Sequence, residues 1–267
     1  MTESTDVKKI ALRVRPYSKS KLDKAYDERF YQNQLNISLV SARIYLRFLW
    51  KFVQPASVLD VGCGRGAWLK ACQELGSKTL FGFDGIWNSQ SSMIEPKINF
   101  RSIDLNKPFS LPEKVDIAIT LEVAEHLEPS KAPQFIKCIT NSSDLILFSA
   151  AYTKQEGTNH LNEQPHTYWA MLFAERDFVP FDMFRPQFWG NETIDFWYRQ
   201  NTFLYVKKDS DPYRQIKAHG FEEMANISFM NCIHPKLYEA KTQMVSFSNH
   251  IADLMPSLWR ALRRRLG

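Results

Sequence analysis

The pattern of apolar and polar residues predicts strands and helices that alternate along most of the chain. Short apolar runs with many β-branched residues predict seven strands, at residues 57–61, 79–83, 100–103, 115–121, 145–149, 179–181 and 202–206. Apolar residues at helical spacing predict helices between them, at residues 37–52, 67–75, 131–140 and 170–178. This alternation predicts an α/β fold, a doubly wound seven-stranded sheet with helices on both faces. We expect its last two strands to form an antiparallel pair.

The pattern also divides the chain into three parts. Residues 1–25 carry few apolar side chains and predict a flexible N-terminal arm, residues 26–208 form the α/β domain, and residues 209–267 form a helical C-terminal extension. Within the extension, residues 254–267 place a stripe of leucines and a tryptophan beside four arginines, which predicts a short basic amphipathic helix. Three roles stay open for this tail: contact with a membrane surface, contact with a protein partner, and solvated capping.

Charge and composition change this picture little. The formal net charge is +5, and it falls to +1 when the four terminal arginines at 260 and 263–265 are set aside, so the body carries no strong nucleic-acid signal. The longest apolar runs are too short to span a bilayer, and residues 1–16 lack the features of a secretory signal. The four cysteines form no C-x-x-C pair. We therefore expect a cytoplasmic protein with reduced thiols.

Three alternating glycines follow the first predicted strand and precede a helix. Glycine permits positive φ and lets a ligand approach the backbone closely. The spacing G-x-G-x-G differs from the dinucleotide fingerprint G-x-G-x-x-G, and Asp60 lies two residues before the first glycine. A carboxylate there would repel a pyrophosphate but suits the ammonium and sulfonium of S-adenosylmethionine. The predicted cofactor-binding residues are Asp60, Gly62, Cys63, Gly64 and Gly66.

Residues 58–66, Val-Leu-Asp-Val-Gly-Cys-Gly-Arg-Gly, closely resemble the first motif of class I S-adenosylmethionine-dependent methyltransferases. The resemblance implies their Rossmann-like fold and their cofactor. Asp84, followed by Gly85, ends the second strand about 20 residues past the glycines, where an acidic residue accepts hydrogen bonds from ribose hydroxyls. A surface-turn aspartate is the alternative. Asp104 and Leu105 resemble the pair that holds the adenine.

A group of carboxylates and imidazoles follows the strand 115–121. With a helical turn over residues 122–126, Glu122, Glu125 and His126 face one point, at the sheet edge where ligands of α/β folds bind. Such ligands suit a divalent ion such as Mg²⁺ or Mn²⁺. The motif E-x-x-E-H with a distant histidine resembles the metal set of small-RNA 3′-end 2′-O-methyltransferases and of ubiquinone-pathway O-methyltransferases. That resemblance implies the ligands Glu122, Glu125, His126 and His160, with His166 as a substitute for His160.

A metal-free interpretation uses the same residues differently, because E-x-x-E-H-L also occurs in class I methyltransferases that bind no metal. His160 or His126 is then the general base, and Glu163 orients it. Glu122 and Glu125 shape the pocket, with Glu122 also a cofactor contact. In the simplest version His126 is a hydrogen-bonded histidine at the edge of the core.

The polar segment 157–169 contains the motif Asn-His-x-Asn-Glu-Gln. Together with the glycine motif, it resembles a subset of class I methyltransferases found with polysaccharide and glycoconjugate genes, over residues 26–206. The resemblance implies O-methylation of a sugar hydroxyl of a glycan or glycoconjugate, and the basic tail would suit work at the inner membrane face. The alternatives are a small-molecule or natural-product O-methyltransferase, an RNA 2′-O-methyltransferase, and a catalytically inactive binding or scaffold module, against which the intact cofactor motif argues. The aromatic residues near 188 and 196–198 are core or, for a minority, part of an acceptor pocket.

Overall fold

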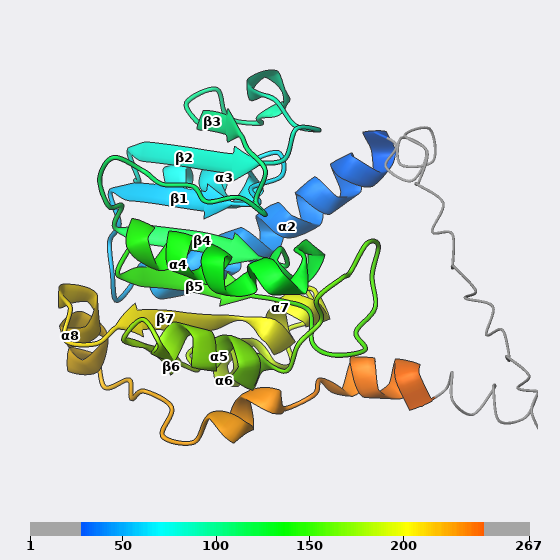
Figure 1. Ribbon diagram of the computed structural model, residues 1–267, viewed down its shortest axis with the longest axis vertical. Coiled ribbons are helices and arrows are strands. Elements are labelled where there is room, and N and C mark those ends of the chain that lie inside the picture. Colours follow the sequence, from blue (N-terminus) through cyan, green and yellow to red (C-terminus); the bar gives the residue numbers. More distant parts are fainter. Residues whose placement is uncertain (1–27, 243–267) are drawn as a thin grey trace, which may run out of the picture.

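The computed structural model describes residues 28–242, drawn in colour in Figure 1. The N-terminal arm predicted at 1–25 and the basic tail predicted at 254–267 lie outside these residues. None of the described helices is long and apolar enough to cross a membrane.

A single seven-stranded sheet forms the centre of the described chain, as expected. Its strands are β1 (Ser57–Val61), β2 (Thr79–Asp84), β3 (Asn99–Ser102), β4 (Ile117–Leu121), β5 (Leu145–Ser149), β6 (Phe178–Phe181) and β7 (Phe203–Lys207). Their order is β3-β2-β1-β4-β5-β7-β6. The first five strands pair in parallel, whereas β7 is antiparallel to both β5 and β6. The predicted antiparallel pair is therefore confirmed, and the carboxyl ends of β1, β2 and β4 meet at one edge.

Helices cover both faces of the sheet (Figure 1). They are α2 (Glu28–Leu49), α3 (Ala67–Glu74), α4 (Ala132–Ser142), α5 (His166–Ala174), α6 (Arg185–Phe188), α7 (Phe196–Asn201) and α8 (Asp211–Ala218). One buried cluster joins the sheet to α2 and α3 through side chains such as Tyr45 and Trp68. A second cluster joins it to α4 and α5 through Phe135 and Phe173. These two apolar layers hold the sheet edge in place.

Two helices differ from the prediction by three residues or more at both ends. The first helix begins at Glu28 and ends at Leu49, earlier at both ends than the predicted 37–52. Helix α5 begins at His166, directly after Pro165, and ends at Ala174, whereas the apolar spacing predicts 170–178. The C-terminal end moves because Phe178 pairs with Lys207 and starts β6. Pairing between strands thus overrides the local helical pattern.

The C-terminal extension folds back against the α/β domain. After α8 it continues through the 3-10 helix η4 (Ile227–Asn231), and residues 235–242 are helical. The Arg185 guanidinium donates to the carbonyl oxygens of Phe229 and Met230, at 2.9 and 2.7 Å, and forms an ion pair with Asp182 at 2.7 Å. The side chain of Met230 is buried in the cluster beneath α5. This contact brings the extension beside the start of α5.

Candidate active site

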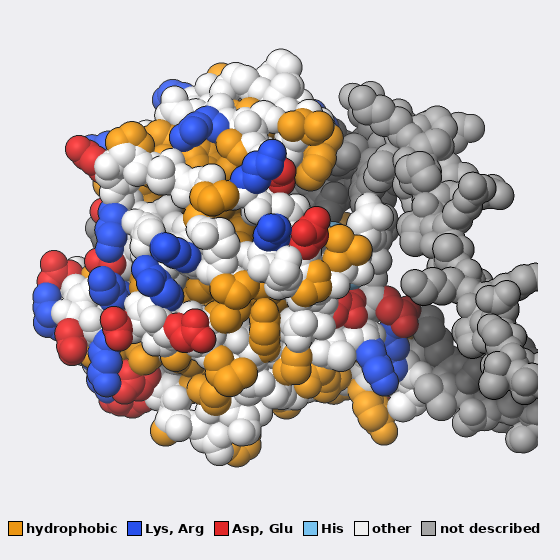
Figure 2. Space-filling model, in the orientation of Figure 1, with side chains coloured by type: hydrophobic (Ala, Val, Ile, Leu, Met, Phe, Trp, Pro, Cys, Tyr) orange, Lys and Arg blue, Asp and Glu red, His pale blue; other side chains and the backbone are white. Residues whose placement is uncertain are grey.

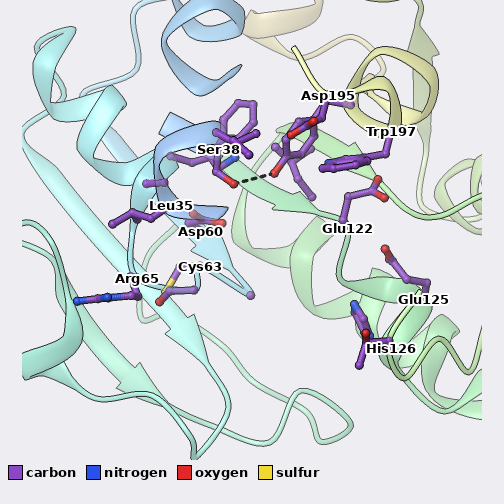
Figure 3. Close-up of a pocket in the computed structure, with 18 of the residues that line it drawn as sticks. Leu35, Ser38, Asp60, Cys63, Arg65, Glu122, Glu125, His126, Asp195 and Trp197 are labelled. Atoms are coloured by element: carbon purple, nitrogen blue, oxygen red, sulfur yellow. Dashed lines mark hydrogen bonds between the residues drawn. The ribbon is translucent and has the colours of Figure 1, made fainter. Parts of the chain in front are cut away.

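One cavity of about 540 Å³ lies at the edge where β1 and β4 end. It contains the glycine loop together with residues of the carboxylate and imidazole group, so the two predicted sites are one. Figure 3 shows Asp60 and Cys63 on one side, Glu122, Glu125 and His126 on the other, and Asp195 and Trp197 beside Glu122. The position fits the rule that ligands of open α/β sheets bind beyond the carboxyl ends of the strands.

The glycine loop adopts the backbone that its sequence requires. Gly62, Gly64 and Gly66 have φ of 80°, 53° and 86°. A Cβ atom added at Gly62 would lie 2.3 Å from a methyl group of Val123, whereas one added at Gly64 would meet nothing within 4 Å. Gly62 therefore packs against the chain after β4, and Gly64 presents open backbone to the cavity, where a ligand can approach.

Asp60 places a buried carboxylate beside this loop. One of its oxygens, Oδ2, makes no hydrogen bond. Burial, and secondarily the charge of Asp84, raises the pKa of this carboxyl well above its usual range. A cation bound in the cavity would satisfy the unpaired oxygen and favour the ionised form. The ammonium of S-adenosylmethionine is such a cation.

Asp84 holds the loop from the end of β2. Its Oδ2 accepts from the backbone N–H of Gly64 and its Oδ1 from that of Gly85, both at 2.6 Å. The carboxylate thus clamps the glycine loop, while the predicted contact with ribose stays a prediction. Asp104 and Leu105 follow β3, and Asp104 accepts from the N–H of Asn106 at 3.0 Å. Neither residue is among those that line the cavity, so the adenine contact also stays a prediction.

Glu125, His126 and His160 converge, although His160 is distant in sequence. One potential ligand atom from each lies within 4.8 Å of the others, and the two imidazole rings are 4.9 Å apart between centroids. The backbone brings them together, because the carbonyl oxygen of Glu125 accepts from the N–H groups of Leu161 and Asn162 at 2.7 and 2.9 Å. The polar segment 157–163 is thereby fixed on the 3-10 turn η2 (Ala124–His126).

The Glu125 carboxylate is fully buried and unpaired. It is 0% exposed, and neither of its oxygens makes a hydrogen bond of ordinary geometry. Burial and the neighbouring Glu122 raise its pKa well above the usual range, and the backbone amides of Glu125 and Ala151 offset this only in part. Buried carboxylates without partners are rare, because an isolated buried charge is costly. A cation held between Glu125 and the two histidines would remove that cost.

Hydrogen bonds set the orientation of both imidazoles. His160 Nδ1 lies 2.7 Å from Glu163 Oε1, and His126 Nδ1 lies 3.3 Å from the carbonyl oxygen of Asn159. In each neutral ring Nδ1 is therefore the donor, and Nε2 keeps its lone pair for a metal ion or a proton. The predicted orienting role of Glu163 agrees with this geometry.

Glu122 lines the same cavity but does not join the metal-binding group. Its φ is 57°, so the expected helical turn over 122–126 is reduced to a 3-10 turn at 124–126. The carboxylate instead accepts from Asn201 Nδ2, at 3.1 and 3.3 Å, and from Gln155 Nε2 at 3.2 Å. The hydrogen bonds of Glu122 thus go to α7 and to the chain after β5, and its carboxylate is not part of the group formed by Glu125, His126 and His160.

His166 is not a substitute for His160, and that prediction is wrong. The side chain is 2% exposed at the start of α5. Both of its ring nitrogens face buried partners, the carbonyl oxygen of Met230 and the side chain of Asn201. Its position in a helix beneath the extension excludes it from the cavity.

The sequence analysis missed several residues that line the cavity. Asp195, at the start of α7, is one of them, whereas Trp197 and Tyr198 belong to the aromatic group 196–198 that was predicted as core or as part of an acceptor pocket. Asp195 Oδ2 is buried without a partner, and burial raises the pKa of this carboxyl. Helix α2 contributes Leu35, Ile37 and Ser38, and Ser38 Oγ lies 3.4 Å from the Tyr198 hydroxyl (Figure 3). Ile37 and Ser38 lie in the helix that was predicted at 37–52, and Leu35 precedes its predicted start.

Comparisons with known proteins show the family of the chain. The family model described as "Methyltransferase domain" matches residues 31–181, more than half of the chain. A comparison with curated protein sequences finds no match.

Similar solved structures include human N-acetylserotonin methyltransferase in complex with S-adenosylmethionine, with 20% identity, a TM-score of 0.46, and 67% of this chain and 55% of that chain covered. An O-methyltransferase family protein from Burkholderia thailandensis has 13% identity, a TM-score of 0.48 and coverage of 72% and 63%. Magnesium protoporphyrin IX methyltransferase from Synechocystis PCC 6803, with bound S-adenosylhomocysteine, has 17% identity, a TM-score of 0.48 and coverage of 71% and 95%. This chain spans less than two thirds of the length of the first two.

Proposed function

The chain belongs to the methyltransferase domain family, and from this premise we propose that it transfers a methyl group from S-adenosylmethionine to a sugar hydroxyl. We propose further that Glu125, His126 and His160 hold a divalent metal ion beside the acceptor. The buried Glu125 carboxylate supports this second proposal most directly. Both of its oxygens lack a hydrogen-bond partner, and the carboxylate lies close to two imidazoles.

The chain's own residues bind and orient the reactants in this proposal. The open backbone at Gly64 and the unpaired oxygen of Asp60 fit the amino-acid end of the cofactor. The cofactor supplies the methyl group. A divalent ion on the carboxylate and the two imidazoles would lower the pKa of hydroxyls that it coordinates. Glu163 keeps His160 in the tautomer whose Nε2 lone pair faces away from it, ready to bind the ion or to accept the proton of the hydroxyl.

The charges around the cavity support a neutral acceptor. Four carboxylates line the part of it beyond β4: Glu122, Glu125, Glu156 and Asp195. Among the described residues that line the cavity, Arg65 is the sole lysine or arginine, and it lies in the glycine loop. On the face shown in Figure 2, lysines and arginines are scattered among acidic residues. An RNA backbone would meet repulsion here instead of the basic surface that phosphates require.

A sugar ring also fits the side chains around Glu122. Trp197 is partly exposed and lines the cavity beside Asp195 (Figure 3). An aromatic face packs well against the C–H surface of a sugar, and a carboxylate accepts hydrogen bonds from its hydroxyls. This combination, and not the similarity to other structures, is what supports a carbohydrate acceptor.

The deciding experiment is a calorimetric titration. S-adenosylhomocysteine is titrated into chelator-treated protein, and Mn²⁺ is then titrated into the complex, for wild type, Glu125→Gln and the exposed control Glu128→Gln. We expect cofactor binding in all three and a metal isotherm that only Glu125→Gln loses. Cofactor binding without a metal isotherm in wild type would overturn the metal site and leave His160 as the base. Absence of cofactor binding would overturn methyl transfer itself.

The acceptor is tested separately with radiolabelled S-adenosylmethionine. We expect label on neutral glycosides and none on short RNA of matched concentration. Labelled RNA would contradict the proposed acceptor class.

A further inference from the structure

A buried chain of polar side chains connects His166 to the cavity. Asn201 Nδ2 donates to both oxygens of Glu122, and Asn201 Oδ1 lies 3.0 Å from His166 Nε2. On the other side of the ring, His166 Nδ1 lies 2.7 Å from the carbonyl oxygen of Met230. His166 is 2% and Asn201 0% exposed. Their hydrogen bonds must therefore be satisfied within the protein.

Two backbone amides determine which way the side-chain amides point. The N–H of His234 donates to Gln200 Oε1 at 2.7 Å, so Gln200 turns its Nε2 toward Asn201 Oδ1, at 2.9 Å. The N–H of Tyr152 donates to Gln155 Oε1 at 3.2 Å, and the same oxygen accepts from Asn201 Nδ2 at 3.0 Å. A backbone N–H can only donate, so neither glutamine can be flipped. Held between them, Asn201 cannot be flipped either.

This orientation leaves both nitrogens of His166 facing acceptors, the Met230 carbonyl oxygen and Asn201 Oδ1. A neutral imidazole carries only one N–H, and its other nitrogen would set a lone pair against an oxygen. We propose that His166 is a buried imidazolium and that, through Asn201, it acts as a positioning residue that keeps the Glu122 carboxylate ionised and aimed into the cavity.

The proposal requires that His166 and Glu122 are charged together, as a cation and an anion. Burial lowers the pKa of His166 and raises that of Glu122, so burial disfavours the charged form of each group. The Arg185 guanidinium, which shares the Met230 carbonyl, also opposes a cation at His166, but it is paired with Asp182 at 2.7 Å. Arg185 and Asp182 form one pair of opposite charges, and His166 and Glu122 form a second. Asn201 lies between the members of the second pair and is hydrogen-bonded to both. Opposite charges in a buried site stabilise each other more than they do in water.

The inference is independent of the acceptor, although the Glu122 charge that it requires also raises the pKa of the Glu125 carboxyl. Glu122 accepts three hydrogen bonds, two from Asn201 and one from Gln155, whereas a carboxylate has about four acceptor positions. The remaining capacity is available to a ligand in the cavity. The positive φ of Glu122 places its carboxylate against α7 at a cost in backbone strain, as is common at functional sites.

The test is ¹⁵N NMR of protein labelled at histidine, at pH 7.5 without added metal. We expect His166 to show hydrogen on both ring nitrogens. Loss of its signals in His166→Gln assigns them, and if that variant does not fold, contacts with Phe203, whose ring centroid lies 5.3 Å from the imidazole, provide the assignment. A His166 spectrum with one unprotonated nitrogen would overturn the proposal.

The coupling to Glu122 is tested by two matched variants. Glu122→Gln is expected to lower the pKa of His166 by about 1 unit or more, because an opposite charge is lost. Glu156→Gln removes another carboxylate that lines the cavity, one that makes no hydrogen bond to Asn201, and should leave that pKa in place. An equal response to both variants, or to neither, would show that Asn201 does not couple His166 to Glu122.

Discussion

At the scale of single residues, Gly157 decides where His160 lies. A Cβ atom added there would lie 2.2 Å from His160 Nε2 and 2.3 Å from its Cε1 atom, and the backbone of Gly157 is outside the positive-φ region. We therefore predict that Gly157→Ala displaces the imidazole without straining the backbone. The expected result is a Mn²⁺ dissociation constant raised by about 10-fold or more, measured by electron paramagnetic resonance titration.

Gly190→Ala is the control, because a Cβ atom at Gly190 would meet nothing within 4 Å. It should bind Mn²⁺ as wild type does. If Gly157→Ala also retained full affinity, His160 would not be a ligand.

The buried carboxylate of Glu125, the proposed metal ligand, is expected to lower the stability of the metal-free protein. Its folded pKa is raised, so its contribution to stability is complete below the unfolded pKa and is lost as the pH rises through the folded pKa. Glu125→Gln removes that loss and should raise the free energy of unfolding of metal-free protein by about 2 kcal/mol at pH 8. The gain should shrink toward pH 5. Urea unfolding in the presence of a chelator measures both values, and a gain that grew as the pH fell would contradict the assignment.

At the scale of elements, the turn from β1 to α3 depends on Gly62. Its φ of 80° disfavours any side chain, and an added Cβ atom would also lie 2.3 and 2.8 Å from two methyl groups of Val123. We predict that Gly62→Ala lowers the free energy of unfolding by about 2–4 kcal/mol, as strain and overpacking add. Urea unfolding measures the loss.

Gly64→Ala separates the two causes. Gly64 has a φ of 53° but open space around it, so its variant carries strain without a clash and should lose less stability. It should nevertheless weaken S-adenosylhomocysteine binding, because the new methyl group enters the space beside the loop. Equal stability losses in both variants would rule out the contact with Val123 as a cause.

At the scale of the whole molecule, Arg185 ties the extension to the α/β domain. It is 6% exposed, it pairs with Asp182, and it donates to the carbonyl oxygens of Phe229 and Met230. Lysine cannot reproduce this fork of donors. We predict that Arg185→Lys lowers the free energy of unfolding by about 2–3 kcal/mol, measured by urea unfolding.

The matched control is Arg214→Lys, because Arg214 also pairs with an aspartate three residues earlier, Asp211, but both side chains are exposed. The expected change there is about 0.5 kcal/mol or less. Similar losses in the two variants would mean that burial of the Arg185 contacts is not what stabilises the extension.

The fold was predictable because its determinants are local. β-branched runs, the alternating glycines and helical spacing indicated all seven strands and the antiparallel pair. The errors, such as the end of α5 at Ala174 instead of residue 178, arose where pairing of β6 with β7 overrode the local pattern. Boundaries of this kind depend on partners far along the chain, which periodicity does not report.

The site was predictable only in part, for a related reason. Glu125 and His126 are adjacent, so one turn brings both to the cavity, and the motif indicated them. Glu122 is in the same motif, but its positive φ and its hydrogen bonds to Asn201, 79 residues away, move it out of the metal-binding group. Asp195 and Trp197 reach the cavity only because α7 packs beside the sheet edge.

The sequence by itself determined the strand, glycine loop and helix at residues 57–74, because steric limits on φ and the pattern of burial act over a few residues. It also determined which chemical groups are available. Tertiary structure alone decided which of them meet: His160 with Glu125, and His166 with Glu122 through Asn201. These contacts join segments that are distant in sequence. Closing the long loop of chain between two such segments costs conformational entropy, which is offset only when the packed core forms.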